Sequence, residues 1–257
     1  MMRRQVPELR GAFMRAPLER RSRAAAAWKL RAVTGVSPSI LRGYLAELDG
    51  SPLPAHLRAA AGEYLRTAGD APGTVYEEEG AVLYALVRAL RPATVVETGT
   101  ANGSSTAYLL AALARNDSGR LVSIDLPFAA DADGLHPLVA GARIDPNDAS
   151  PLPPGRSPGW MVPEELHDRW ELRLGDAREL LPAALDELGR IEFFFHDSLH
   201  TREHMLFEFE QAWPRLGEGG VLAADDIFQR RHDALPAFAG SVGRAYNTFS
   251  GLGFVTK

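Results

Sequence analysis

The chain of 257 residues contains no cysteine. This absence excludes disulfide bonds, thiolate nucleophiles and thiolate metal ligands, so any metal site must use oxygen or imidazole ligands. The sequence also lacks an apolar run near the roughly 20 residues that cross a bilayer, and it lacks the charged start and apolar stretch of a secretory signal. We therefore expect a soluble, unexported, cytoplasmic protein with no membrane partner.

The charges of the chain are distributed unevenly. The net charge is −5, but residues 1–42 contain ten basic and only two acidic residues, so this arm carries +8 and the remainder −13. A basic arm can contact nucleic acid, direct import into an organelle, or dock as a helical segment on an acidic body or a second subunit. The arm lacks the interleaved aromatic residues of a nucleic-acid binder, and its apolar residues Leu9, Phe13 and Leu18 need a buried environment. We therefore favour docking, with a homo-oligomer as the expected assembly.

The chain divides into an irregular first part and a regular second part. Residues 1–75 are predicted to be a helical extension broken by prolines, which serves as a substrate cover or an oligomer contact. From residue 76 to residue 257, predicted strands and helices alternate. The predicted strands lie at 94–97, 121–125, 171–174, 191–195 and 221–224, and the predicted helices at 80–90, 105–115, 177–188 and 202–215. Alternation predicts a mostly parallel α/β sheet with helices on both faces, and residues 245–257 predict a closing antiparallel hairpin.

One segment interrupts this alternation. Residues 127–169 are far longer than a single crossover helix requires, and the part from 141 to 163 is rich in proline and glycine. Long connections without regular structure are uncommon in compact domains unless they are functional or disordered. We interpret the segment as a lid-like insertion over the site, with a surface insertion as the alternative.

A strand, a glycine-bearing turn and a helix form the most informative motif. Glu97, Gly99 and Gly103 mark the turn, and the next strand ends at Asp125. Such a unit offers backbone N–H groups and a helix N-terminus to a nucleoside, while the strand-end acid can accept hydrogen bonds from ribose hydroxyls. The two glycines are four residues apart, unlike those of a dinucleotide fingerprint, and Glu97 would repel a pyrophosphate but suit a cationic amino-acid ligand. An NAD-linked oxidoreductase is therefore a disfavoured alternative.

Acidic residues follow the next two predicted strands. Asp197 comes after the strand at 191–195, and Asp225 and Asp226 come after the strand at 221–224. The carboxyl ends of neighbouring parallel strands meet in one crevice, and crowded carboxylates are costly unless a cation lies among them. An oxygen-only cluster suits Mg²⁺ or another divalent cation. The alternative is that Asp225 caps a helix or that one acid faces solvent.

His200 lies about one helical turn beyond Asp197 and can face the same crevice. An imidazole with a pKa near 6.5 is a suitable base for a hydroxyl at neutral pH. Two other interpretations remain open: a structural histidine, or a zinc site that uses the spacing of His196, His200 and His204.

The pattern Glu-x-Gly-x-x-x-Gly with a later strand-end Asp resembles class I S-adenosylmethionine (SAM) methyltransferases. Asp197-x-x-His200 with the later pair Asp225-Asp226 resembles the divalent-metal-dependent O-methyltransferases, and the likeness covers about residues 77–257. Catechol O-methyltransferases have lysine in the position of His200 and often asparagine in that of Asp226. Bacterial natural-product sugar O-methyltransferases have histidine at the first of these positions.

The resemblance assigns roles to individual residues. It places Glu97, Gly99 and Gly103 in the SAM loop, Ser105 near the amino-acid end of SAM, and Asp125 at the ribose. It places Asp176 and Ala177 at the adenine. Ser105 and Asp176 could each instead cap the helix that follows.

Together these observations predict a SAM-dependent, Mg²⁺-dependent O-methyltransferase. The expected acceptor is a hydroxyl of a small molecule, such as a sugar or a secondary metabolite. The alternative of another class is an inactive SAM-binding scaffold or regulatory subunit, which the three crowded acids disfavour because a scaffold does not need them.

Overall fold

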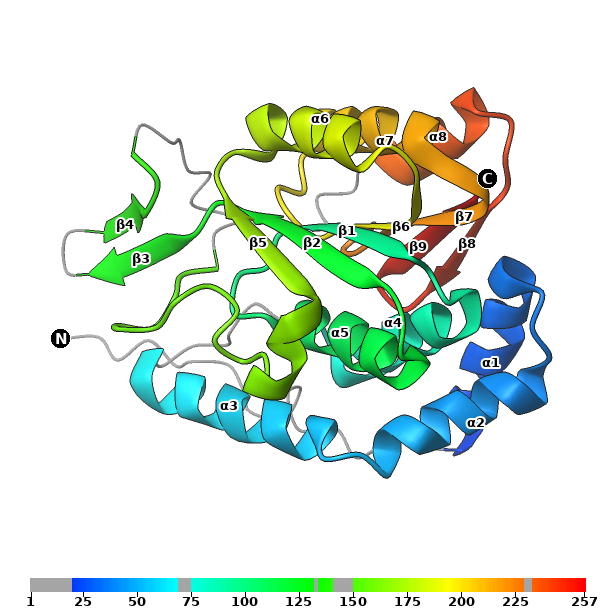
Figure 1. Cartoon of the computed structure of the whole chain (residues 1–257), viewed down its shortest axis with the longest axis horizontal. Coiled ribbons are helices and arrows are strands. Elements are labelled where there is room, and N and C mark those ends of the chain that lie inside the picture. Colours follow the sequence, from blue (N-terminus) through cyan, green and yellow to red (C-terminus); the bar gives the residue numbers. More distant parts are fainter. Residues whose placement is uncertain (1–19, 69–74, 132–133, 141–149, 229–232) are drawn as a thin grey trace, which may run out of the picture.

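The computed structural model describes residues 20–68, 75–131, 134–140, 150–228 and 233–257. Its centre is a seven-stranded sheet in the order β5-β2-β1-β6-β7-β9-β8 (Figure 1). The strands are β1 (Thr94–Thr98), β2 (Arg120–Asp125), β5 (Trp170–Leu174), β6 (Ile191–His196), β7 (Leu216–Ala224), β8 (Tyr246–Phe249) and β9 (Leu252–Thr256). The first five strands of this order run parallel, whereas β9 is antiparallel to both β7 and β8. The predicted parallel sheet with a C-terminal antiparallel hairpin is confirmed.

Helices cover both faces of the sheet, as predicted. Helices α4 (Glu77–Leu90) and α5 (Ser104–Asn116) lie on one face, and α6 (Ala177–Leu188), α7 (Arg202–Ala212) and α8 (Ala234–Ser241) lie on the other (Figure 1). None of the helices in the described part of the chain combines the length and apolar character that crossing a membrane requires.

Alternating strand residues fill the two layers of the core. On β6, Phe193 and Phe195 join the apolar cluster of the α4 and α5 face, while Phe194 joins the cluster of α6, α7 and α8. All three rings are fully buried. A strand that is buried on both faces therefore reads as a continuous apolar run, as Ile191–His196 largely does.

Three helices precede the sheet: α1 (Arg20–Thr34), α2 (Pro38–Asp49) and α3 (Leu53–Ala68). Pro38 begins α2, because the fixed φ of proline suits a first helical turn whose N–H groups have no intrahelical partner. The three helices share the apolar cluster of α4 and α5. Helix α1 contacts α2, α4 and the hairpin strands β8 and β9 of its own chain, so this part of the basic arm docks on the body. The apolar residues Leu9, Phe13 and Leu18 lie outside the described residues.

The insertion at 127–169 contains elements that the sequence did not predict. Strands β3 (Phe128–Asp131) and β4 (Gly134–Pro137) form a small antiparallel hairpin that projects at one end of the molecule (Figure 1), and a 3₁₀ helix, η1 (Glu164–Arg169), precedes β5. Residues 141–149 of the predicted lid lie outside the described ranges.

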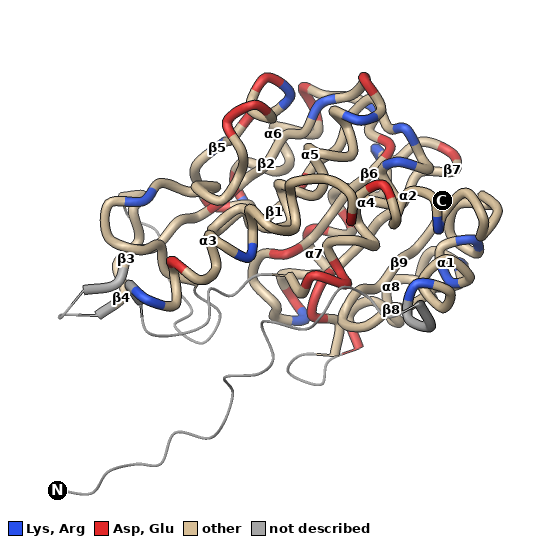
Figure 2. The backbone as a smooth tube through the Cα atoms, turned by 90° about the horizontal axis from the view of Figure 1, so that it is seen from below, with Lys and Arg blue, Asp and Glu red and all other residues tan. Residues whose placement is uncertain are grey.

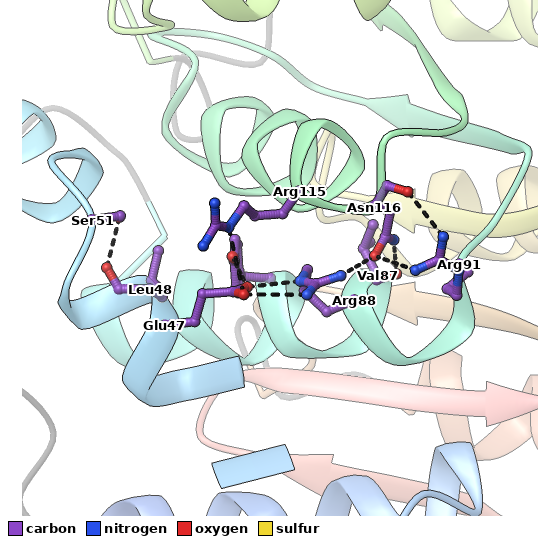
Figure 3. A network of polar contacts seen from close by, with 9 residues as sticks. Glu47, Leu48, Ser51, Val87, Arg88, Arg91, Arg115 and Asn116 are labelled. Carbon is purple, nitrogen blue, oxygen red and sulfur yellow. Dashed lines mark hydrogen bonds and ion pairs between the residues drawn. The ribbon is translucent and has the colours of Figure 1, made fainter. Parts of the chain in front are cut away.

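A partly buried network of polar contacts joins α2 to α4 and α5 (Figure 3). Glu47 accepts hydrogen bonds from the Tyr84 hydroxyl at 2.5 Å and from Arg88 Nε at 2.8 Å, and Arg115 Nε lies 3.4 Å away. Arg88 continues to Asn116, whose Nδ2 donates to the helix α4 backbone. Burial opposes ionisation, but the hydrogen bonds from Arg88 and Tyr84 and the nearby arginine charges lower the pKa of Glu47. The network fixes the N-terminal helices to the sheet layer.

We expect Glu47→Gln to lower the free energy of unfolding by about 1–3 kcal/mol near neutral pH, since it removes charge-assisted hydrogen bonds from a partly buried site. The pKa of Glu47 is lower when folded, so its contribution is present above the ordinary value of 4.5. It is lost as the pH falls through the lower folded value. Urea unfolding of both proteins at about pH 7 and about pH 4 should therefore show a smaller difference at the lower pH. Glu187→Gln is the control, because the ion pair of Glu187 with Arg173 is at the surface. If the difference in unfolding free energy between the wild type and Glu47→Gln is the same at both pH values, the lowered pKa of Glu47 is contradicted.

Candidate functional site

Four strands end together at one edge of the sheet. Strands β2, β1, β6 and β7 are neighbours, and their pairing continues to their last residues, with Thr98 opposite Ile124 and His196, and His196 opposite Ala224. The segments that follow these strands therefore meet in one crevice. In open α/β sheets, ligands bind in such a crevice.

The glycine loop, residues 99–103, joins β1 to α5 in a backbone conformation that favours glycine at both ends. Gly99 has φ +87° and Gly103 has φ +94°, both in the left-handed region. A Cβ atom at Gly99 would lie 2.0 Å from the carbonyl oxygen of Asp197, and one at Gly103 would lie 2.7 Å from the Cα of Gly159. The loop thus fits closely against the end of β6 on one side and against residue 159 on the other.

Asp125, the last residue of β2, holds the start of the glycine loop. Its Oδ1 accepts hydrogen bonds from the N–H groups of Thr100 at 3.0 Å and Ala101 at 3.1 Å. Its Oδ2 is buried and has no hydrogen-bond partner among the described residues. Burial raises the pKa of Asp125, although the two N–H donors oppose the rise. Because an unsatisfied buried carboxylate oxygen is costly, this atom is a candidate acceptor for a ligand hydroxyl.

The strap, residues 150–163, covers the outer side of the glycine loop. Gly159 N donates to the carbonyl oxygen of Ala101 at 2.9 Å, and the indole Nε1 of Trp160 donates to Asn102 Oδ1 at 2.7 Å. Asn102 is buried, with 1% of its surface exposed. The strap is therefore a direct neighbour of the candidate ligand loop.

Helix α3 holds the strap from the opposite side. His56 Nε2 donates to the carbonyl oxygen of Met161 at 3.0 Å, and the Tyr64 hydroxyl donates to that of Pro151 at 3.0 Å. Met161 N in turn donates to Asn102 O at 3.0 Å. The strap part of the predicted lid is thus enclosed between the N-terminal helices and the glycine loop.

The three acids assigned to a metal lie together at the ends of β6 and β7. Burial, followed by the charges of Asp225 and Asp226, raises the pKa of Asp197 well above its ordinary value. Burial, with the charges of Glu79 and Asp226, raises the pKa of Asp225 to about 7. Asp197 is therefore within reach of the charges of Asp225 and Asp226, and Asp225 is within reach of those of Glu79 and Asp226. Figure 2 shows the wider asymmetry, with acidic residues around α4 and α7 and basic residues along α1.

Glu79 of α4 adds a fourth carboxylate to this cluster. Its Oε1 accepts the N–H of Gly251 at 2.8 Å, and its Oε2 accepts the N–H of Tyr76 at 2.9 Å. A Cβ atom at Gly251 would lie 2.9 Å from Glu79 Oε1 and 3.4 Å from Asp225 Oδ1. Asp225 Oδ1 is buried without a hydrogen-bond partner in the described ranges, and it lies close to the hairpin turn at Gly251.

His200 lies beside these acids. Its side chain is 6% exposed, and its Nε2 is 3.8 Å from Asp197 Oδ1. Its ring packs edge to face against His196, with ring centroids 5.2 Å apart. The structure thus brings the predicted base and the first predicted metal ligand to the same place.

His196 and His204 are not arranged with His200 as zinc ligands. His196 Nδ1 and His204 Nε2 instead bond to Glu208 at 2.6 Å and 2.9 Å. No group of three or more histidine, aspartate or glutamate side chains in the described ranges is arranged to hold a metal ion. The zinc alternative therefore receives no support, and the predicted Mg²⁺ site is not preformed.

Residues 96–227 match a protein family described as a methyltransferase domain. The match covers half of the chain and includes the glycine loop and the three acids Asp197, Asp225 and Asp226. The chain belongs to this methyltransferase family. Comparison with functionally characterised protein sequences gives no significant match.

Solved structures with the same fold support this assignment. The O-methyltransferase from Bacillus cereus in complex with SAH has a TM-score of 0.54 and 19% identity, over 79% of this chain and 91% of that one. The O-methyltransferase TomG from Streptomyces achromogenes, involved in tomaymycin synthesis and solved with SAM, has a TM-score of 0.53 and 19% identity, over 78% and 88%. CalS11, a TDP-rhamnose 3'-O-methyltransferase of calicheamicin biosynthesis, has a TM-score of 0.50 and 18% identity, over 97% and 98%. The methyltransferase therefore has the predicted class I methyltransferase fold.

Glu97 of this methyltransferase is held inside the protein. The side chain is fully buried, and its carboxylate accepts hydrogen bonds from Ser105 at 2.7 Å, Thr106 at 2.8 Å and Ser123 at 2.6 Å. Burial raises the pKa of Glu97 to about 7, although the three hydroxyl donors oppose the rise. Glu97 and Ser105 thus bond to each other, and the bonds of Glu97 join β1 to β2 and α5. We therefore expect both residues to support the conformation of the glycine loop from the protein interior.

Asp176 and Ala177 follow β5 at the edge where Asp125 lies. Gly175 N donates to the carbonyl oxygen of Asp125 at 2.8 Å, which brings this turn beside the end of β2. Asp176 also caps α6, because its Oδ1 accepts the N–H of Arg178 at 2.8 Å. The capping alternative is thus observed, and a role at the adenine stays a prediction for both residues.

Two buried carboxylates of the methyltransferase site were missed from the sequence. Glu79 lies on a helix whose first turn has three consecutive glutamates, and nothing in that run distinguishes the one that turns inward. Glu208 lies on α7, where His204 four residues earlier was the only available signal. Both residues reach the site by tertiary packing.

Proposed function

We propose that this methyltransferase transfers the methyl group of SAM to a hydroxyl of a small molecule, with the help of a divalent cation. The observation that carries the proposal is the position of Asp225 Oδ1, a buried carboxylate oxygen without a partner in the described structure. The charges of Glu79 and Asp226 help to raise the pKa of Asp225, and the charge of Asp225 helps to raise that of Asp197, beside the end of β6 that touches Gly99. A cation at this place would relieve the repulsion next to the SAM loop.

The donor set fits a hard divalent cation. Carboxylate oxygens are the ligands that Mg²⁺ prefers, and Asp197, Asp225 and Asp226 would hold it. When bound, the cation would supply stabilisation for negative charge that develops on the acceptor oxygen. Small side-chain movements would have to complete the site, because the described side chains form no preformed group of three metal ligands.

Other residues of the site bind SAM and accept the proton of the acceptor. Asp125 Oδ2 accepts hydrogen bonds from the ribose hydroxyls, and the glycine loop orients the amino-acid end of the ligand. His200 accepts the proton of the acceptor hydroxyl through its imidazole. SAM supplies a methyl group on a sulfonium sulfur, an electrophile that needs no further activation. The strap and α3 keep water from the outer side of the loop, and positioning of the two reactants contributes on the order of 7–11 kcal/mol in favourable cases.

A sugar hydroxyl is the acceptor class that we favour. The histidine at position 200, where catechol-type enzymes have lysine, supports this choice, as does the fold likeness to CalS11 along nearly the whole chain. The direct test is incubation with SAM, Mg²⁺ and either TDP-rhamnose or catechol, with the methylated product detected by mass spectrometry. Methylation of the sugar nucleotide with little reaction of catechol would support the proposal. SAM binding without methylation of any hydroxylated acceptor across a wider panel would favour the inactive scaffold.

We expect Asp125→Asn to weaken SAM binding while the fold is kept. Each charge-assisted hydrogen bond to ribose is worth about 1.5–3 kcal/mol, so its loss corresponds to roughly a 10-fold to 150-fold higher dissociation constant. Titration calorimetry without added metal measures the effect, because the proposed SAM contacts do not involve the acidic cluster. Asp186→Asn on the exposed surface of α6 is the matched control. An affinity equal to that of the wild type would remove Asp125 from the site.

A further inference from the structure

Glu208 on α7 is completely buried, and both oxygens of its carboxylate accept hydrogen bonds. It accepts hydrogen bonds from Thr98 Oγ1 at 2.6 Å, His196 Nδ1 at 2.6 Å, Ser198 Oγ at 2.8 Å and His204 Nε2 at 2.9 Å. Burial opposes its ionisation, but His196 and His204 hold the pKa of Glu208 below its ordinary value. A buried carboxylate with four donors is a rigid junction, because losing any donor leaves an oxygen less satisfied.

The junction joins the two halves of the methyltransferase site. Thr98 directly precedes Gly99, where the glycine loop begins, and Ser198 directly follows Asp197 in the β6–α7 loop. The two hydroxyls donate to different oxygens of Glu208. The SAM side and the acceptor side are therefore bonded to one carboxylate. Backbone pairing reaches the first residue of the β6–α7 loop, where Asp197 N donates to Thr98 O at 2.8 Å, but among the described residues it does not join residues 198–201 to the glycine loop.

A second route leads from Glu208 to the predicted base. The hydrogen bond at His196 Nδ1 fixes the orientation of that ring. The ring of His200 rests against it edge to face, at an interplanar angle of 72°. Glu208 thus supports the loop at Ser198 and the ring at His200.

We propose that Glu208 is a positioning residue, which fixes the β6–α7 loop against the glycine loop and so sets the distance between the acceptor oxygen and the methyl group. This inference rests on the proposed function. A misplacement of about 1 Å can lower turnover by about 100-fold without any change in the reacting groups. Glu208 itself touches neither reactant.

The test compares amide hydrogen exchange with and without SAM in the wild type, Ser198→Ala and Thr98→Val. Each variant removes one hydroxyl donor, and valine keeps the shape of threonine. The matched control is Tyr84→Phe, which removes a hydroxyl donor to Glu47 in the network between α2 and α4 and leaves the bonds of Glu208 in place. In the wild type and the control, SAM should slow exchange about tenfold both at residues 95–105 and at residues 197–201. In Ser198→Ala and Thr98→Val, the slowing should persist at 95–105 and be lost at 197–201.

Turnover supplies a second readout with any acceptor that the wild type methylates. In each single variant kcat should fall by about 10-fold to 100-fold with an unchanged KM for SAM. The double variant should be no slower than the slower single variant, since one broken link already releases the loop.

Three results would contradict these claims, and they separate the positioning role from the proposed function. Slowing at residues 197–201 that is the same in the wild type and both variants would overturn the positioning role and leave the proposed function intact. Additive losses of kcat in the double variant would do the same. Absence of any SAM effect at residues 95–105 of the wild type would overturn the proposed function, and the positioning role with it.

Discussion

His200→Ala should lose turnover by about 10²-fold to 10⁴-fold, the usual cost of removing a general base. The ring is almost fully buried beside Asp197, so it can receive a proton only from a group inside the crevice. SAM affinity should be unchanged, because no proposed SAM contact involves this side chain. Steady-state kinetics together with calorimetry separate the two quantities.

A matched control is His136→Ala, since His136 lies on the exposed surface of β4. Added imidazole should restore part of the activity of His200→Ala if the lost group is a base. Full activity in His200→Ala would return this residue to the structural interpretation, in which its contact with His196 is its main role.

Asp225→Asn should abolish the effect of Mg²⁺ and lower turnover by more than about 10²-fold, because stabilisation by a bound cation is worth several kcal/mol. A chelator should have the same effect on the wild type, and added Mg²⁺ should restore activity. An independent measurement is thermal unfolding, where Mg²⁺ should raise the midpoint of the wild type and not that of the variant. In the absence of metal the variant should be at least as stable as the wild type, since it removes one of several repelling charges.

Asp117→Asn serves as the control for this series, because Asp117 is almost fully exposed and pairs only with Arg169 among the described residues. Activity of the wild type that survives exhaustive chelation would remove the cation from the mechanism. The methyltransferase would then depend on His200 and positioning alone.

Most of the sheet could be predicted from the sequence, because strands buried on both faces of a sheet appear in the sequence as short apolar runs. Helix α6 was predicted with its observed bounds, helped by Asp176 as a capping residue. Strand β7 begins at Leu216, five residues before its prediction, because a glycine-rich start reads as a turn. Helix α8 was missed, since Pro236 and Gly240 argue against a helix when packing against α7 is unknown.

The site was predictable where its residues follow strand ends. Gly99, Asp125, Asp197 and Asp225 were brought together by parallel order alone. The support for these residues was not predictable, because it comes from helices and from the strap. The role of Asn102 was not predicted, because its hydrogen-bond partner Trp160 lies far along the chain.

The strap has a consequence for the rate of ligand exchange. Its backbone amides at Gly159 and Met161 are bonded to the glycine loop, while α3 bonds its carbonyl groups from outside. The loop therefore cannot open outward unless these hydrogen bonds break or the strap and α3 move with it. With SAM bound at the glycine loop as proposed, its residence time is expected to depend on His56 and Tyr64 of α3, which bond to the strap. Substitutions there would change how quickly product leaves while the chemical step stays the same.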